Sequence, residues 1–106
     1  MKFDMNKMLQ EAQRMQAELA KAQEEAASEI VEASAGGGMV TVKANGAGEV
    51  VEIAIDPRAI DPDDPELLAD LVLAAVNEAL RSSRSLMESK MSGLMPGDLG
   101  GLLPGS

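Results

Sequence analysis

Charged residues recur every seven positions near the start of the chain, where cations could bind phosphate groups. The acidic and basic members of this repeat are Asp4, Glu11, Glu18 and Glu25, and Lys7, Arg14 and Lys21. Each basic residue precedes an acidic one by four positions, a spacing that pairs the two on one side of a helix. The repeat therefore has two interpretations: a solvated helix face whose charges neutralise each other, or a cationic stripe that follows phosphates.

Side chains for enzymatic chemistry are scarce. The sequence has no Cys and no His, which excludes thiolate nucleophiles, histidine proton transfer and the usual zinc sites. The acidic loop 56–66 lacks the ligand spacing of a calcium loop, and its three prolines predict a stiff connector. Gly36–Gly38 lacks the Lys and Ser/Thr of a phosphate loop and predicts a turn. We expect no enzymatic activity, no metal and no cofactor.

Charge is distributed unevenly along the chain. The net charge is −9, from 18 acidic and 9 basic residues, and this favours solubility over attraction to phosphate. Residues 49–70 carry a net charge of −7, whereas residues 81–91 carry +2. If two terminal helices run antiparallel, Lys2 and Lys7 come near the end of the second helix and form a basic tip. That tip would contact phosphates, or its cations would only complement a helix C-terminus.

A long helix must present the charged repeat. Good helix formers without Gly or Pro predict a helix from about Asp4 to Ala27. Its apolar residues alternate spacings of three and four, which is typical of a seam that pairs with another helix. The seam residues are Met5, Met8, Ala12, Met15, Leu19, Ala22 and Ala26.

The apolar period then changes to two, which predicts strands. A short β-prone segment covers 30–33, and 39–44 places Val40, Val42 and Ala44 on one face. Residues 45–48, Asn-Gly-Ala-Gly, predict a hairpin connection. The return strand ends before Pro57 and places Val51, Ile53 and Ile55 on one apolar face. One face of the sheet therefore needs covering.

A second helix is predicted from Asp64, a capping residue before Pro65, to about Met91. The apolar stripe of its first half has the width of a helix packed on a sheet, and we expect it to cover the Val51, Ile53 and Ile55 face. The first helix, about 36 Å long, exceeds strands of about 20 to 23 Å, so it overhangs the sheet. We predict an α+β domain over residues 1–92.

Residues 93–106 form a Gly-, Leu- and Pro-rich tail. We expect it to be flexible alone, and either inert or docked on a partner. The N-terminus has no apolar leader region, and no stretch approaches the roughly 18 apolar residues of a membrane span. The sequence therefore predicts a cytoplasmic protein without a membrane partner.

Several short segments, in this order, resemble the YbaB/EbfC family of bacterial nucleoid-associated proteins, and the likeness covers nearly the whole chain. They are MLQEAQRMQ at 8–16, GGGMVTVK at 36–43, Asn45-Gly46, Ile55-Asp56-Pro57, LVLAAVNEA at 71–79 and Lys90-Met91 before the tail. The resemblance implies an alpha-beta-beta-beta-alpha fold with a small antiparallel sheet. It also implies a tight homodimer with protruding helices, and binding to double-stranded DNA with little sequence preference.

The resemblance also implies which residues contact DNA, because the family uses basic residues of its two helices. Here these correspond to Lys2, Lys7, Arg14, Lys21, Arg81, Arg84 and Lys90. The leading hypothesis is a dimeric DNA-binding protein of the nucleoid that holds the phosphate backbone and takes part in nucleoid organisation and gene regulation. The alternative is an acidic interaction or scaffold module with weak or no DNA binding, which recruits a protein through the acidic loop, the tail or the helix seam.

Overall fold

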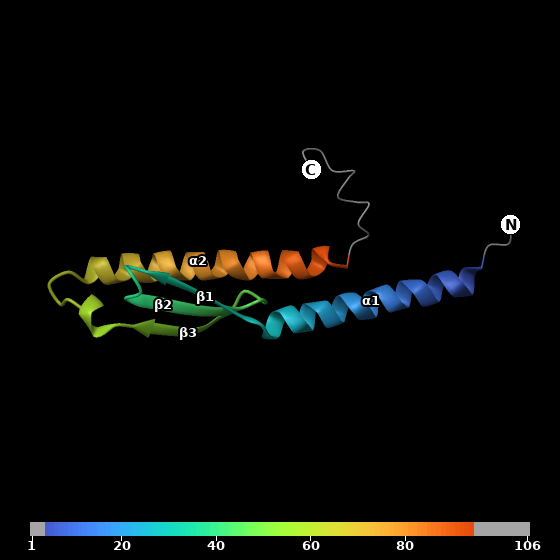
Figure 1. The fold of residues 1–106 in the computed structure, drawn as a ribbon, viewed down its shortest axis with the longest axis horizontal. Helices are drawn as coiled ribbons and strands as arrows, with labels where there is room; N and C mark the ends of the chain where they lie inside the picture. The colour runs from blue at the N-terminus through green and yellow to red at the C-terminus, as the bar shows by residue number, and fades with distance from the viewer. Residues whose placement is uncertain (1–3, 95–106) are drawn as a thin grey trace, which may run out of the picture.

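The computed structural model describes residues 4–94, which form a helix, three strands and a second helix (Figure 1). The elements are α1 (Met5–Ser28), β1 (Ile30–Ala35), β2 (Val40–Asn45), β3 (Val50–Ile55), the short 3-10 helix η1 (Pro57–Ala59) and α2 (Pro65–Ser92). The predicted α+β class and its alpha-beta-beta-beta-alpha order are confirmed.

Both helices begin at an aspartate that caps free backbone amides. The Asp4 carboxylate accepts a hydrogen bond from the Lys7 amide at 3.2 Å, and the Asp64 carboxylate accepts one from the Leu67 amide at 3.3 Å. Such caps stabilise the first helical turn, where amides lack an intrahelical partner. The helix bounds therefore lie within a residue or so of those that the sequence predicts.

The three strands form one antiparallel sheet in the order β1-β2-β3. Val42 in the central strand pairs with Ala33 of β1 and Ile53 of β3. Gly36, Gly37 and Gly38 connect β1 to β2 with φ angles of 64°, 68° and 93°. Side chains with a Cβ rarely adopt this left-handed conformation, so the run of three glycines makes the turn possible.

α2 packs on β1 and β2, and the core between them is built from small residues. The core residues are Ala33, Val40, Val42, Ala44, Ala75 and Ala79. One polar contact joins the layers, because the buried Ser83 hydroxyl donates to the Asn45 carbonyl at 2.6 Å. The predicted inward face of β2 is confirmed, but no Leu, Ile, Met or Phe of the described residues is fully buried.

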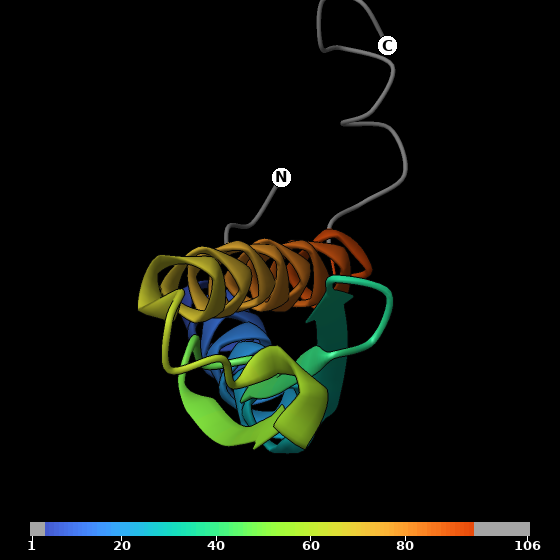
Figure 2. The ribbon, with the colours of Figure 1, turned by 90° about the vertical axis from the view of Figure 1, so that its left-hand side faces the viewer.

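The prediction that α2 covers the apolar face of β3 is wrong. Figures 1 and 2 show β3 as the strand farthest from α2, beyond β1 and β2. Val51, Ile53 and Ile55 remain 52%, 46% and 38% exposed. The centre of the α2 stripe is alanine, which brings the helix close to two strands, and the twist of the sheet carries the third away. β3 is thus an open edge strand with an uncovered apolar face.

α1 lies against the rest of the chain only along its C-terminal half, where Ala22 and Ala26 are buried. The remainder of the helix projects beyond the sheet and beyond the end of α2, as Figure 1 shows. The radius of gyration is 20.5 Å, whereas a compact chain of this length has about 13 Å. The predicted overhang of the first helix is therefore confirmed.

Candidate nucleic-acid interface

The basic residues of α1 form one exposed stripe along the projecting helix. Lys7, Arg14 and Lys21 are all exposed, and successive members are separated by about 10 Å along the axis. Helix geometry places the acidic heptad positions between this stripe and the apolar seam. Arg14 contacts Glu18, with its Nε 3.8 Å from Oε1. Among residues 4–94, Lys7 and Lys21 form no ion pair and are free to meet a phosphate.

Arg81 and Arg84 lie on the side of α2 that faces away from the sheet. They are three residues apart, so they are neighbours on the helix surface, and both are exposed, whereas Ser83 between them is buried. The Arg81 guanidinium donates to Glu78 Oε2 from Nη2 at 2.7 Å and from Nε at 3.1 Å. Arg84 has no ion pair in the described part of the chain, which makes it the less neutralised of the two.

Lys90 differs from the other basic residues because it serves an internal contact. Its Nζ lies 2.7 Å from Glu29 Oε1, at the junction of α1 and β1. The hydrogen bond to Glu29 raises the pKa of Lys90, and the negative charges of Glu29 and Glu25 raise it further. Lys90 therefore ties the end of α2 to the end of α1.

The basic tip expected from antiparallel helices does not form as predicted. Lys90 contacts Glu29 at the C-terminal end of α1, so Lys7 lies about 33 Å further along the helix, at 1.5 Å per residue. The helices do run antiparallel, but they overlap only along the C-terminal half of α1 (Figure 1). The basic residues are thus spread along two helix surfaces. Lys2 lies outside the described residues.

Other charged groups are neutralised locally. Lys43 Nζ lies 3.4 Å from Glu52 Oε2 across β2 and β3. Arg58 donates to the Asp56 carboxylate at 2.9 Å, and this contact lowers the pKa of Asp56 and raises that of Arg58. Within the described range, no cluster of three or more acidic side chains has the arrangement of a metal site. Nor does any helix there have the length and apolar character needed to cross a membrane.

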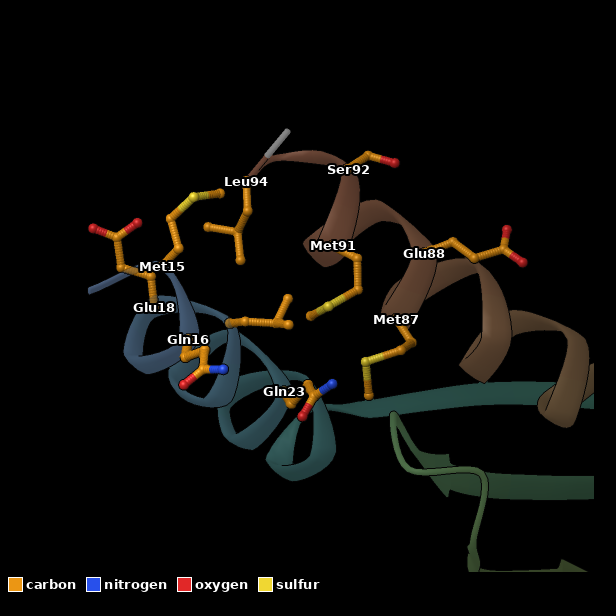
Figure 3. A pocket seen from close by; sticks show the side chains of 10 residues that line it. Met15, Gln16, Glu18, Gln23, Met87, Glu88, Met91, Ser92 and Leu94 are labelled. Carbon is orange, nitrogen blue, oxygen red and sulfur yellow. The ribbon is translucent and has the colours of Figure 1, made fainter. Parts of the chain in front are cut away.

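Two exposed apolar surfaces result from the way the elements pack. One is the β3 face described above, which the sequence predicts to be apolar but covered by α2. The other is a groove of about 800 Å³ between α1 and α2, the α1–α2 groove. Its apolar lining is Met15, Leu19, Met87, Met91 and Leu94. Figure 3 shows Met91 of α2 and Leu94, just after α2, pointing toward α1, with Met15 close by. The seam at Met15 and Leu19 is predicted from the sequence, but its approach to Met87 and Met91 of α2 is not.

Comparison with known proteins identifies relatives that match most of the chain. A sequence model of the YbaB/EbfC DNA-binding family matches residues 1–99. A nucleoid-associated protein of Thermoanaerobacter pseudethanolicus is 50% identical over 95 residues, which is 90% of this chain and 86% of its own. One from Moorella thermoacetica is 55% identical over 89 residues, or 84% and 86% of the two chains. One from Streptomyces avermitilis is 48% identical over 102 residues, or 96% and 90%.

The fold has a counterpart among solved structures. The crystal structure of an uncharacterized protein from Helicobacter pylori superposes with a TM-score of 0.76 and covers 90% of this chain and 100% of that one. The two sequences are 23% identical. The likeness therefore supports the alpha-beta-beta-beta-alpha fold.

Proposed function

The chain belongs to the YbaB/EbfC DNA-binding family, a nucleoid-associated family, and from that membership we propose that it binds double-stranded DNA as a homodimer. The contacts are to the phosphate backbone and carry little sequence preference. The observation that carries the proposal is the pair of exposed basic surfaces on α1 and α2. The protein acts in the cytoplasm at the nucleoid, where it takes part in DNA organisation and gene regulation without catalysis.

The exposed apolar surface supports assembly from two chains. Val51, Ile53 and Ile55 form a row on an edge strand whose outer backbone groups have no strand partner among the described residues. A second copy placed against this row would bury it.

The proposed DNA-contacting residues differ in whether each basic side chain already forms an ion pair with a carboxylate of the same chain. Lys7, Lys21 and Arg84 form no ion pair in the described part of the chain, whereas Arg14 and Arg81 share their charge with a glutamate. An exposed pair of this kind is weak and exchanges readily for a phosphate. Lys90 is the least available of the seven predicted contacts, because it is engaged with Glu29.

The proposal is tested by the salt dependence of binding to duplex DNA. In R81E/R84E, each chain loses two cations near the DNA, so affinity at low salt falls by more than about tenfold. The slope of log affinity against log salt becomes shallower by about 3 to 4 for the dimer, at roughly 0.9 per lost phosphate contact. Fluorescence anisotropy with a labelled duplex across a salt series measures both quantities.

The matched control is K43E/R58E, which changes the net charge by the same amount. Lys43 and Arg58 lie on β2 and η1, away from the proposed DNA surface, and both are ion-paired. We expect this control to keep most of the affinity and the parental slope. An equal loss in both variants, with unchanged circular dichroism, would assign the effect to net charge and contradict the placement on α2.

A second candidate function rests on the charge of the assembly. Two chains at −9 carry −18, and the acidic loop lies at the opposite end from the α1 arm (Figure 1). This favours a scaffold that recruits a basic protein partner through the loop. The outcome in its favour is no binding to long duplex DNA at about 50 mM salt, together with a discrete protein retained by the wild type and lost when loop acids are neutralised.

A further inference from the structure

The α1–α2 groove is open at the place where the described chain ends. Leu94, the last described residue, lines the groove together with Met15 of α1 and Met91 of α2 (Figure 3). The lining is mostly apolar, yet Met15 and Leu19 are 60% and 43% exposed. The described chain therefore ends directly beside an apolar surface that is only partly filled.

The same apolar surface continues along α1 beyond the end of α2. Met8 and Met5 lie on the seam on the N-terminal side of Met15 and are 52% and 63% exposed. No described element lies against this part of α1, which projects freely in Figure 1. The uncovered seam from Met15 to Met5 is about 15 Å long, at 1.5 Å per residue.

The chain that follows Leu94 has the length and composition to cover this seam. Residues 95–106 include four apolar side chains, Met95, Leu99, Leu102 and Leu103, and four glycines that permit close approach to a helix. Twelve residues in extended form reach about 40 Å, more than twice the uncovered length. We propose that residues 95–106 pack into the α1–α2 groove and along the Met15 to Met5 seam of the same chain.

Attachment at Leu94 favours the chain's own α1 over that of a second copy. A segment tethered at the rim of its site has an effective concentration in the millimolar range, well above that of a free partner. The second copy has a separate apolar surface available on β3. The segment leaves the basic stripe uncovered, because Lys7, Arg14 and Lys21 lie on a different side of α1 from the seam. It stabilises the projecting arm without blocking its cations.

The absence of natural cysteine permits a direct test by disulfide formation in the full chain. In A12C/G101C, one thiol lies on the seam and the other in the C-terminal segment. In the matched control Q10C/G101C, the α1 thiol lies on the opposite side of the helix. In a glutathione buffer, we expect the seam pair to form an intrachain disulfide with at least about tenfold higher effective concentration than the control. Equal values for the two pairs, or a disulfide between chains, would overturn the proposal.

Methionine oxidation gives an independent readout that does not involve DNA. In L99S/L102S/L103S, the C-terminal segment loses its apolar side chains, so hydrogen peroxide reaches Met5 and Met8 at least about threefold faster than in the wild type. Met39, between β1 and β2, is the internal reference and keeps its rate. Peptide mass spectrometry measures all three sites. Identical Met5 and Met8 rates in the two proteins would contradict docking, whatever the DNA affinity.

Discussion

Gly46, in the hairpin between β2 and β3, lies directly against the C-terminal end of α1. Its amide donates to the Glu29 carbonyl at 3.2 Å. A Cβ added to Gly46 would lie 2.0 Å from the Ala26 carbonyl oxygen and 2.6 Å from its carbon. Both are backbone atoms, which have no rotamer to adopt. The orientation of the projecting α1 arm thus depends on the absence of one side-chain carbon.

Gly46→Ala is therefore expected to displace the end of α1 and to lower the free energy of unfolding by about 2 to 3 kcal/mol, the cost of overpacking a close contact. Urea unfolding followed by circular dichroism measures the change. Gly93→Ala is the control, because its added Cβ meets nothing closer than 3.6 Å, and it should change stability by less than about 0.5 kcal/mol. Similar losses in the two variants would mean that the Gly46 contact does not orient α1.

The Lys90–Glu29 contact predicts a pH dependence of stability. The folded-state pKa of Lys90 is raised above its ordinary value of 10.5 by Glu29. A raised pKa means that the folded state holds the proton more tightly, so the stabilisation is complete below pH 10.5 and is lost as pH rises through the folded-state pKa. Lys90→Met should thus be less stable than the wild type at neutral pH, and this difference should shrink at higher pH.

Urea midpoints at about pH 8 and about pH 11.5 test this, with the change between them as the readout. Lys21→Met is the matched control, since Lys21 is exposed and has no ion pair among residues 4–94. It should show no such convergence with the wild type. A Lys90→Met deficit that stays constant across this range would show that packing of the lysine stem, and not its charge, joins α2 to α1.

In the proposed dimer, β3 supplies the apolar surface through which the two chains pack against each other. Its apolar row lies on the same face as Val42, with which Ile53 is paired, yet α2 does not reach it. Ile53→Lys places a charge in the middle of this row, where burial against a second chain would leave it unpaired. We expect the dissociation constant of the dimer to rise at least about 30-fold, as for the loss of an interface hot spot.

Sedimentation equilibrium over a concentration series measures this change. Ala54→Lys is the matched control, because Ala54 is an exposed neighbour on the opposite face of the same strand. It should leave the dissociation constant within about threefold of the wild type. Dissociation by Ala54→Lys and not by Ile53→Lys would place the contact on the other face of β3.

The order of the elements was predictable because each one has a characteristic spacing of apolar residues and is bounded by capping or turn residues. The three-and-four spacing of the Met5 to Ala26 seam indicates a helix, and alternation at Val40 and Val42 indicates a strand with one buried face. The partner of each apolar face was not predictable in the same way. A stripe on α2 indicates that it packs on a sheet, but not on which strands, and β1 carries little alternation of its own.

The same limit applies to the candidate site. Heptad spacing correctly places Lys7, Arg14 and Lys21 on one side of α1. The spacing carries no information on the position of α1 along the axis of α2. In the structure, α1 is displaced along that axis so that Lys7 lies far from the end of α2. The Lys90–Glu29 contact joins residues 61 positions apart in the sequence, and nothing in the local pattern around either residue indicates it.

Across the described residues, the chain leaves more large apolar side chains exposed than it buries in its core. The fully buried side chains are alanines, two valines and one serine, whereas fourteen large apolar residues of the described range are exposed. Small side chains remove little apolar area from water. At about 25 cal/mol per Å², their burial therefore offsets only a small part of the conformational entropy that the chain loses on folding. The isolated fold is therefore expected to be marginally stable, and association to supply much of its stability.

Thermal unfolding reports whether the chain folds alone or only as a dimer. If folding is coupled to dimer formation, the melting temperature rises with chain concentration, because mass action favours the associated state. A hundredfold increase in concentration contributes about 2.7 kcal/mol per dimer, which corresponds to roughly 5 to 10 °C for a dimer of this size. Scanning calorimetry or circular dichroism across that range measures the shift. Ile53→Lys should melt lower and show no concentration dependence. A wild-type melting temperature that is high and independent of concentration would mean that one chain is stable alone, and would remove the energetic argument for the dimer while leaving the β3 test in place.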